Sequence, residues 1–141
     1  TGRASVSILN HFQHISSSFF GPKDLFPDKS SLIEVDNYLE QWPFLSDAVL
    51  LTKFLHYWPD DEAKILLSNA KRAAKKRLYI IEFVLSEDDP GGSLLDLNML
   101  VESGGMERTT NHLVDLLQSV GLKVHSMQSV GWQSICFEVR L

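Results

Sequence analysis

The chain has 141 residues, 44% of them hydrophobic, which is enough to fill one core. Its formal net charge of −5 argues against a nucleic-acid or anionic-membrane surface, because either would need a net positive field. No apolar run approaches the roughly 20 residues that cross a bilayer, and the single cysteine, Cys136, suits a reducing compartment. We therefore expect one soluble, cytoplasmic domain.

The N-terminal part predicts two short strands joined by a helix or irregular turn and a loop. Residues 4–9 alternate small or polar residues with apolar ones, as a strand does. The dipeptides at 21–22 and 27–28 contain proline and mark a loop. Residues 32–35 then predict the second short strand.

Two apolar runs farther along the chain predict buried parallel strands with a helix between them. Residues 48–54 and 78–85 are apolar enough to be buried on both faces. Pro59 and the three acidic residues after it are typical of a first helical turn. We expect this helix to close in a basic cluster that complements its dipole: Lys71, Arg72, Lys75, Lys76 and Arg77.

The C-terminal part predicts two helices and a final hairpin. After a loop at 88–92, residues 94–101 are apolar at helical spacing and stop at two glycines. A second helix over 110–120 is expected to end at Gly121. Residues 122–128 and 134–141 predict the hairpin. Alternating strands and helices indicate an α/β domain with a mainly parallel sheet.

Several sequence blocks carry a resemblance to a known family from about residue 32 onwards. Their order and separations match those of plant caffeic-acid type and hydroxyindole type O-methyltransferases and of bacterial polyketide-tailoring relatives. The blocks are VDNY at 35–38, LTKFLHYWPDDE at 51–62, LYIIEFVL at 78–85, LNMLVESGGMERT at 97–109 and SVGL at 119–122. The resemblance implies a Rossmann-like methyltransferase sheet with an antiparallel terminal hairpin. It also implies an enzyme that moves a methyl group from S-adenosylmethionine to a hydroxyl of an aromatic or polyketide-like small molecule.

The resemblance also implies a catalytic histidine. His56 follows a buried strand, at the sheet end where open α/β folds bind ligands, and an imidazole can take a proton near neutral pH. It matches the family's general base, and Glu82 and Glu107 match the two glutamates that flank that base. The alternatives are a structural or solvated His56, a Glu82 carboxylate that reaches the end of its strand, and a Glu107 that caps a helix start.

Other matched positions belong to the co-substrate and the acceptor. Asp36, Asn37, Lys53 and Trp58 match residues around the adenosyl group, although Trp58 could instead plug the corner between strand and helix. Asn98 and Met99, with Leu97, match a helix that lines the acceptor pocket. These three could equally be helix core.

Four features depart from the family pattern. The first strand and its Gly-x-Gly loop have no counterpart, and neither has the family's helical dimerisation domain. Residues 4–20 resemble the family's second strand and helix, which places Asn10 where an aspartate binds ribose. Tyr57 replaces an aspartate commonly found after the histidine.

We therefore interpret residues 1–141 as a partial methyltransferase domain, completed by a second copy or by a complementing N-terminal segment. The missing central strand predicts one sheet made of the strands at 48–54 and 78–85 with the hairpin. The strands near Val6 and Leu32 are expected apart from it or joined through an added strand. The rival hypothesis is a non-catalytic methyltransferase-like binding or assembly module, or one half of a split enzyme. The histidines show no metal-ligand spacing, so no metal is expected.

Overall fold

The computed structural model describes residues 16, 18–21, 32–86 and 90–141 of the chain. The chain divides into two compact units, Thr1–Phe44 and Leu45–Leu141. The strand expected at 4–9 and the candidate residue Asn10 lie outside the described residues, so both stay predictions.

The first unit contains a small parallel sheet and an aromatic cluster. Strand β1 (Phe19–Gly21) pairs with β2 (Leu32–Glu34). The ring centroid of Phe20 lies 4.7 Å from that of Trp42 and 5.1 Å from that of Phe44. Rings at such distances add contact energy to the area they bury, so these aromatic side chains give the unit a core.

β1 corrects a prediction from the sequence, which placed residues 19–20 in a helix or irregular turn and Gly21 in a loop. The segment is a strand because its backbone pairs in parallel with β2. A strand of three residues is too short to show the two-residue alternation that identifies longer strands. The strand expected at 32–35 is confirmed to within one residue as β2.

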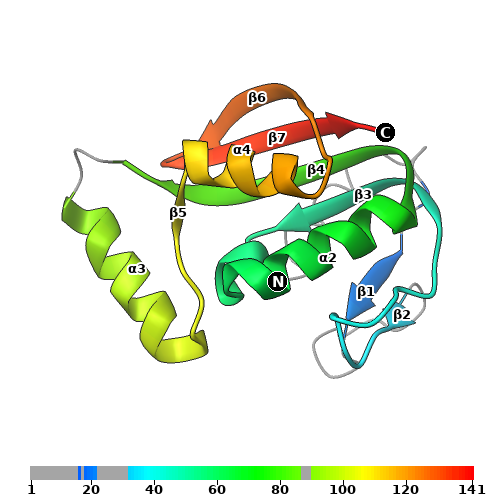
Figure 1. The fold of residues 1–141 in the computed structure, drawn as a ribbon, viewed down its shortest axis with the longest axis horizontal. Helices are drawn as coiled ribbons and strands as arrows, with labels where there is room; N and C mark the ends of the chain where they lie inside the picture. The colour runs from blue at the N-terminus through cyan, green and yellow to red at the C-terminus, as the bar shows by residue number, and fades with distance from the viewer. Residues whose placement is uncertain (1–15, 17, 22–31, 87–89) are drawn as a thin grey trace. The chain divides into compact units, whose positions relative to one another are not determined.

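The second unit is built on a five-stranded sheet. β3 (Ser46–Thr52) pairs in parallel with β4 (Ala74–Leu85). Four of the five strands lie in the order β3-β4-β7-β6, and the fifth pairs with β4 outside this order. Strands β7 (Ser134–Arg140) and β6 (Val124–Gly131) form the antiparallel hairpin, with β7 next to β4 (Figure 1). The predicted contiguous sheet is therefore confirmed, and β2 belongs to a separate sheet.

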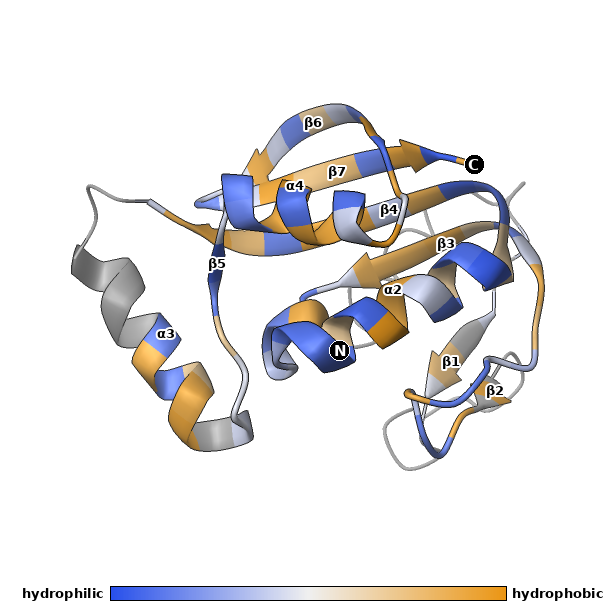
Figure 2. Cartoon of the chain, in the orientation of Figure 1, coloured by the Kyte–Doolittle hydropathy of each residue, from blue (hydrophilic) through white to orange (hydrophobic). Residues whose placement is uncertain are grey.

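Two helices cover one face of this sheet (Figure 1). They are α2 (Asp60–Ala73) and α4 (Thr110–Ser119), which also pack against each other. The apolar colouring of β3, β4 and β7 in Figure 2 marks the strands that they cover. The core side chains that are at most 1% exposed include Leu66, Leu67, Leu78, Ile80, Leu113, Leu117, Phe137 and Val139.

Helix α4 begins and ends as its sequence predicts. The hydroxyl of Thr109 accepts a hydrogen bond from the backbone N–H of His112 at 3.2 Å, which caps the first turn. At the other end Gly121 has φ 72°, and the N–H of Leu122 donates to the carbonyl of Leu117 at 3.0 Å. This is a Schellman motif, which favours glycine at the left-handed position.

The end of α2 differs from the prediction. The helix stops at Ala73 and β4 starts directly at Ala74, so Lys75, Lys76 and Arg77 lie in the strand and not in the last helical turn. Strand pairing explains the difference, because it gives two of these side chains acidic partners. Lys76 bonds Asp47 of β3, and Arg77 bonds Glu138 of β7.

Two further elements refine the C-terminal half. Helix α3 (Pro90–Ser103) starts at its proline, so residues 90–92 extend a helix where a loop was expected. Proline is well suited to a first helical position. The short strand β5 (Arg108–Thr109) pairs in parallel with the end of β4 and was not predicted. None of the helices in the described part of the chain is long and apolar enough to cross a membrane.

Candidate active site

The buried polar side chains of the described residues gather around one turn. This turn is the 3-10 helix η2 (Leu55–Tyr57), which follows β3. Among the side chains that the structure describes, five polar or charged ones are buried. Four of them lie at η2 or bond to it or to its side chains: His56, Glu82, Glu107 and Arg108. Burying a charged group costs free energy unless it is paired. Four buried polar side chains around one turn must therefore be paired with one another or with the backbone.

His56 and Glu107 form a buried pair. The Nδ1 atom of His56 lies 3.1 Å from Oε1 of Glu107, and the two residues are 9% and 8% exposed. Because an ionised carboxylate can only accept, this contact is compatible with an imidazole that carries its proton on Nδ1. The opposite nitrogen, Nε2, is buried and has no hydrogen-bond partner among the described residues.

Glu82 holds the backbone of the same turn and does not bond the imidazole ring. Its Oε1 accepts hydrogen bonds from the N–H groups of Phe54 at 2.8 Å and Leu55 at 2.7 Å. Burial raises the pKa of Glu82, and the two N–H groups and nearby His56 offset part of that rise. Its Oε2 atom is buried without a partner in the described part of the chain.

Arg108, which the sequence did not single out, bonds the backbone at both ends of the same turn. Its guanidinium donates to the carbonyl oxygens of Leu55 at 3.0 Å and Trp58 at 2.7 Å. It also donates to the carboxylate of Asp60 at 2.9 Å. The contacts span 48 to 53 residues, so no local pattern could have revealed them.

Asp60 links Arg108 to the start of α4. Its second oxygen lies 2.8 Å from Nε2 of His112. Burial is the largest influence and raises the pKa of Asp60, but the hydrogen bonds and charges of His112 and Arg108 outweigh it and leave the pKa below its ordinary value. The carboxylate is therefore the stable form of Asp60 at neutral pH.

Two glycines bring the Glu107 segment against the His56 turn. Gly104 has φ 72°, and a Cβ added at Gly105 would lie 2.0 Å from the carbonyl oxygen of His56. That approach lets the N–H of Met106 donate to the same carbonyl at 2.9 Å. Only glycine fits at position 105, because any side chain would overlap the backbone of the turn.

Helix α3 supports Glu107 and presents the expected acceptor-side residues. The N–H of Glu107 donates to Oδ1 of Asp96 at 2.8 Å. Asn98 is exposed and Met99 is half-buried, whereas Leu97 is 56% exposed. The alternative of a closed helix core therefore does not describe Leu97 and Asn98 in this structure.

The residues expected around the adenosyl group are spread over both units. Asp36 and Asn37 are exposed in the first unit, and the side-chain oxygen of Asn37 accepts the N–H of Leu39 at 3.0 Å. Lys53 is exposed at φ 46°, directly after β3. Trp58 is half-buried, with its ring centroid 6.1 Å from that of Phe54.

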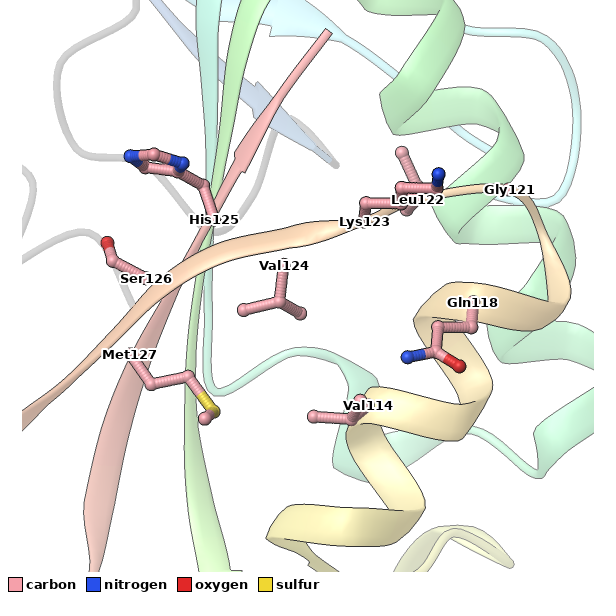
Figure 3. A pocket seen from close by; sticks show the side chains of 9 residues that line it. All are labelled: Val114, Gln118, Gly121, Leu122, Lys123, Val124, His125, Ser126 and Met127. Carbon is pink, nitrogen blue, oxygen red and sulfur yellow. The ribbon is translucent and has the colours of Figure 1, made fainter.

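A separate groove lies between α4 and β6 (Figure 3). Its volume is about 810 Å³, and none of the predicted site residues lines it. Figure 3 shows the side chains of Val114 and Met127 facing each other across it. Within the described residues no group of three or more histidines, cysteines or acidic side chains could hold a metal ion.

Comparison with known proteins decides the family. A family model described as the O-methyltransferase domain matches residues 26–123. The chain belongs to this O-methyltransferase family. Its match includes the turn with His56, the strand with Glu82 and the segment with Glu107.

Three relatives illustrate the range of the O-methyltransferase family. The (RS)-norcoclaurine 6-O-methyltransferase of Coptis japonica is 28% identical over 92% of this chain and 41% of its own length. Aclacinomycin 10-hydroxylase RdmB of Streptomyces purpurascens is 32% identical over 79% of this chain and 31% of its own. The crystal structure of human N-acetylserotonin methyltransferase in complex with SAM superposes with a TM-score of 0.83 and 23% identity, covering 99% of this chain and 44% of that one.

The O-methyltransferase chain thus spans less than half the length of these relatives. The structural likeness confirms the predicted methyltransferase fold. One relative carries the name of a hydroxylase. Membership of the family therefore does not by itself determine which reaction a protein catalyses.

Proposed function

We propose that this protein transfers the methyl group of S-adenosylmethionine to a hydroxyl oxygen of an aromatic or polyketide-like small molecule, with His56 as the general base. The observation that carries the proposal is the buried His56–Glu107 pair, in which Nε2 has no partner among the described residues. A scaffold has no need for an imidazole held by a carboxylate on one nitrogen and open on the other.

The reaction follows from the chemistry of these groups. A phenol with a pKa near 10 is a far better nucleophile once deprotonated. Nε2 of His56 takes the hydroxyl proton while the oxygen attacks the methyl carbon in line. The bond from that carbon to sulfur breaks, and the sulfonium becomes a neutral thioether. Glu107 stabilises the imidazolium that forms, and the proton then passes from Nε2 to water.

Glu82 contributes to this proposal through the backbone. By accepting the N–H groups of Phe54 and Leu55 it fixes where the His56 turn leaves β3. The charges of Glu82 and His56 also interact, which favours the carboxylate form of Glu82. We therefore assign Glu82 the role of positioning the backbone that carries the base, and Glu107 the role of orienting its imidazole ring.

Two further sets of residues are proposed to bind the co-substrate and the acceptor. We assign Asp36, Asn37, Lys53 and Trp58, with Asn10 outside the described residues, to the adenosyl group. For the acceptor we assign Asn98 and Met99 on α3, since an exposed amide and a flexible thioether can adapt to flat ligands. S-adenosylmethionine supplies the activated methyl group.

The assembly and the compartment are also proposals. β3 ends the strand order β3-β4-β7-β6 although Val49 and Leu51 within it are almost fully buried. We propose that a strand from a second copy or from an N-terminal segment pairs with its outer edge, so the 141-residue chain alone would elute as a species larger than a monomer. The free thiol of Cys136 fits a cytoplasmic location.

Labelled methyl transfer tests the proposed reaction. The protein is incubated with methyl-labelled S-adenosylmethionine and a panel of phenols and hydroxynaphthoquinones, and labelled ether is measured by mass spectrometry. His56→Gln should lower turnover by about 10²–10⁴-fold, the contribution of a positioned base. Binding of S-adenosylmethionine, measured by calorimetry, should change little.

The exposed His125 on β6 provides the matched control, because His125→Gln removes an imidazole far from the proposed chemistry in the sequence and outside the buried cluster. That variant should keep wild-type turnover. Unchanged turnover in His56→Gln would remove the base from the mechanism. Tight binding of S-adenosylmethionine with no methyl transfer to any hydroxyl would favour the binding-module hypothesis.

A further inference from the structure

We propose that Arg108 is a positioning residue that sets the orientation of His56 by fixing the turn that carries it. The proposal rests on the proposed function and deepens it. Its guanidinium donates to the backbone carbonyls on both sides of His56, at Leu55 and Trp58, and among the described residues no hydrogen bond joins it to the imidazole.

The geometry of these contacts brackets the base. The carbonyl oxygen of Leu55 precedes His56 by one residue, and that of Trp58 follows it by two. A guanidinium is planar and carries five N–H donors in a fixed fork. One group can therefore hold both carbonyls at a set separation, with each carbonyl on its own nitrogen, whereas the three donors of an ammonium group share a single nitrogen and lack the planar fork.

Arg108 is itself held in place. It is 2% exposed, and its Nε donates to Asp60, whose other oxygen contacts His112. The hydrogen bonds of a buried guanidinium that stays charged are strong and directional. The clamp is therefore anchored to the starts of both α2 and α4.

Three consecutive residues together define the position of His56. The N–H of Met106 bonds the His56 carbonyl, the carboxylate of Glu107 bonds the ring, and Arg108 bonds the flanking carbonyls. Because these three residues are adjacent in the chain, one segment positions both the ring and the backbone of His56. Loosening Arg108 should let the turn rotate relative to Glu107 and weaken the bond at Nδ1.

The test compares Arg108→Lys with Arg140→Lys. Lysine keeps the charge at position 108 and loses the fork, whereas the exposed Arg140 bonds only a neighbouring surface carboxylate, Glu138, among the described residues. For the phenol that the wild type methylates fastest, Arg108→Lys should lower kcat by about 10²-fold, as a misplacement of about 1 Å does. The KM for S-adenosylmethionine should stay within about twofold.

A spectroscopic measurement separates this proposal from the proposed reaction. ¹⁵N shifts of the His56 ring report which nitrogen carries the proton. The wild type should show the Nδ1–H tautomer, and Arg108→Lys should show a mixture of tautomers while Arg140→Lys matches the wild type. Absence of methyl transfer in every protein would refute the reaction and leave this readout intact.

Two results would overturn the proposal. The first is wild-type kcat and an unchanged tautomer in a folded Arg108→Lys variant. The second comes from the wild type and holds even if that variant does not fold. A guanidinium clamped at both ends should give separate, slowly exchanging Nη signals in ¹⁵N spectra, so a freely rotating Arg108 guanidinium would contradict the clamp. Separate signals and a disturbed tautomer support it.

Discussion

Strand β4 and the segment before β5 each bring a buried glutamate to the same turn, and they use it differently. Glu82 of β4 accepts two backbone N–H groups, so it acts on the path of the chain. Glu107 contacts the imidazole of His56, so it acts on the ring of the proposed base. Two carboxylates that look equivalent in the sequence therefore have separate tasks, and single substitutions can tell them apart.

The largest effect is expected at Glu107. Glu107→Gln keeps the shape of the side chain but removes the charge that stabilises an imidazolium, and its amide can present a donor to Nδ1. Turnover should fall by about 10²-fold or more, in the range given by a positioned base. Kinetics with labelled S-adenosylmethionine measure the fall. Turnover equal to that of the wild type would mean that Glu107 is only structural.

The next effect concerns how the Glu107 segment reaches the turn. Gly105→Ala would place a Cβ 2.0 Å from the carbonyl oxygen of His56. The segment must then move away, and we expect a loss of about 3 kcal/mol in the free energy of unfolding, near the upper end for overpacking. Urea denaturation measures it. Gly131→Ala is the control, since a Cβ at Gly131 meets nothing within 4 Å.

The smallest effect is expected for the conservative substitution Glu82→Gln, and its sign depends on pH. Burial raises the pKa of Glu82 above its ordinary value of 4.5, so ionising it costs stability in the folded state. Relative to Glu82→Gln, the wild type should therefore be most stable below pH 4.5 and lose stability as the pH rises toward the raised pKa. Thermal unfolding across this range checks the sign.

A second substitution at Glu82 tests the backbone role. Glu82→Ala removes the acceptor of the Phe54 and Leu55 N–H groups, each of which costs about 1–3 kcal/mol when left buried and unpaired. It should therefore be less stable than Glu82→Gln, whose amide oxygen can still accept both. Equal stabilities of the two variants would show that Glu82 does not hold the turn.

The sequence predicted those parts of the fold that rest on long patterns. The apolar runs that became β3 and β4, the stripe of α4 and the final hairpin each span enough residues for a period to show. That β3, β4 and the hairpin share one contiguous sheet was also predicted, whereas their order β3-β4-β7-β6 was not. The short strands β1 and β5 escaped, since pairing with distant residues and not local pattern defines them.

The residues of the site also fall into those that the sequence could predict and those that it could not. His56 and Glu107 could be named from the residue types and the resemblance, and the structure brings them together. Arg108 could not, because its partners lie far away in the chain and two of them are backbone carbonyls. The backbone target of Glu82 was hidden for the same reason, since a sequence shows side chains and not where main-chain groups point.

The frame around His56 is made largely with main-chain atoms, and this has an evolutionary consequence. The N–H groups of Phe54 and Leu55, the carbonyl of Trp58 and the N–H of Met106 all make framing bonds that do not depend on their own side chains. Substitutions at positions 54, 58 and 106 can therefore change the side chains around His56 without removing those bonds. Proteins with this frame can vary at these positions by drift while the histidine stays where it is.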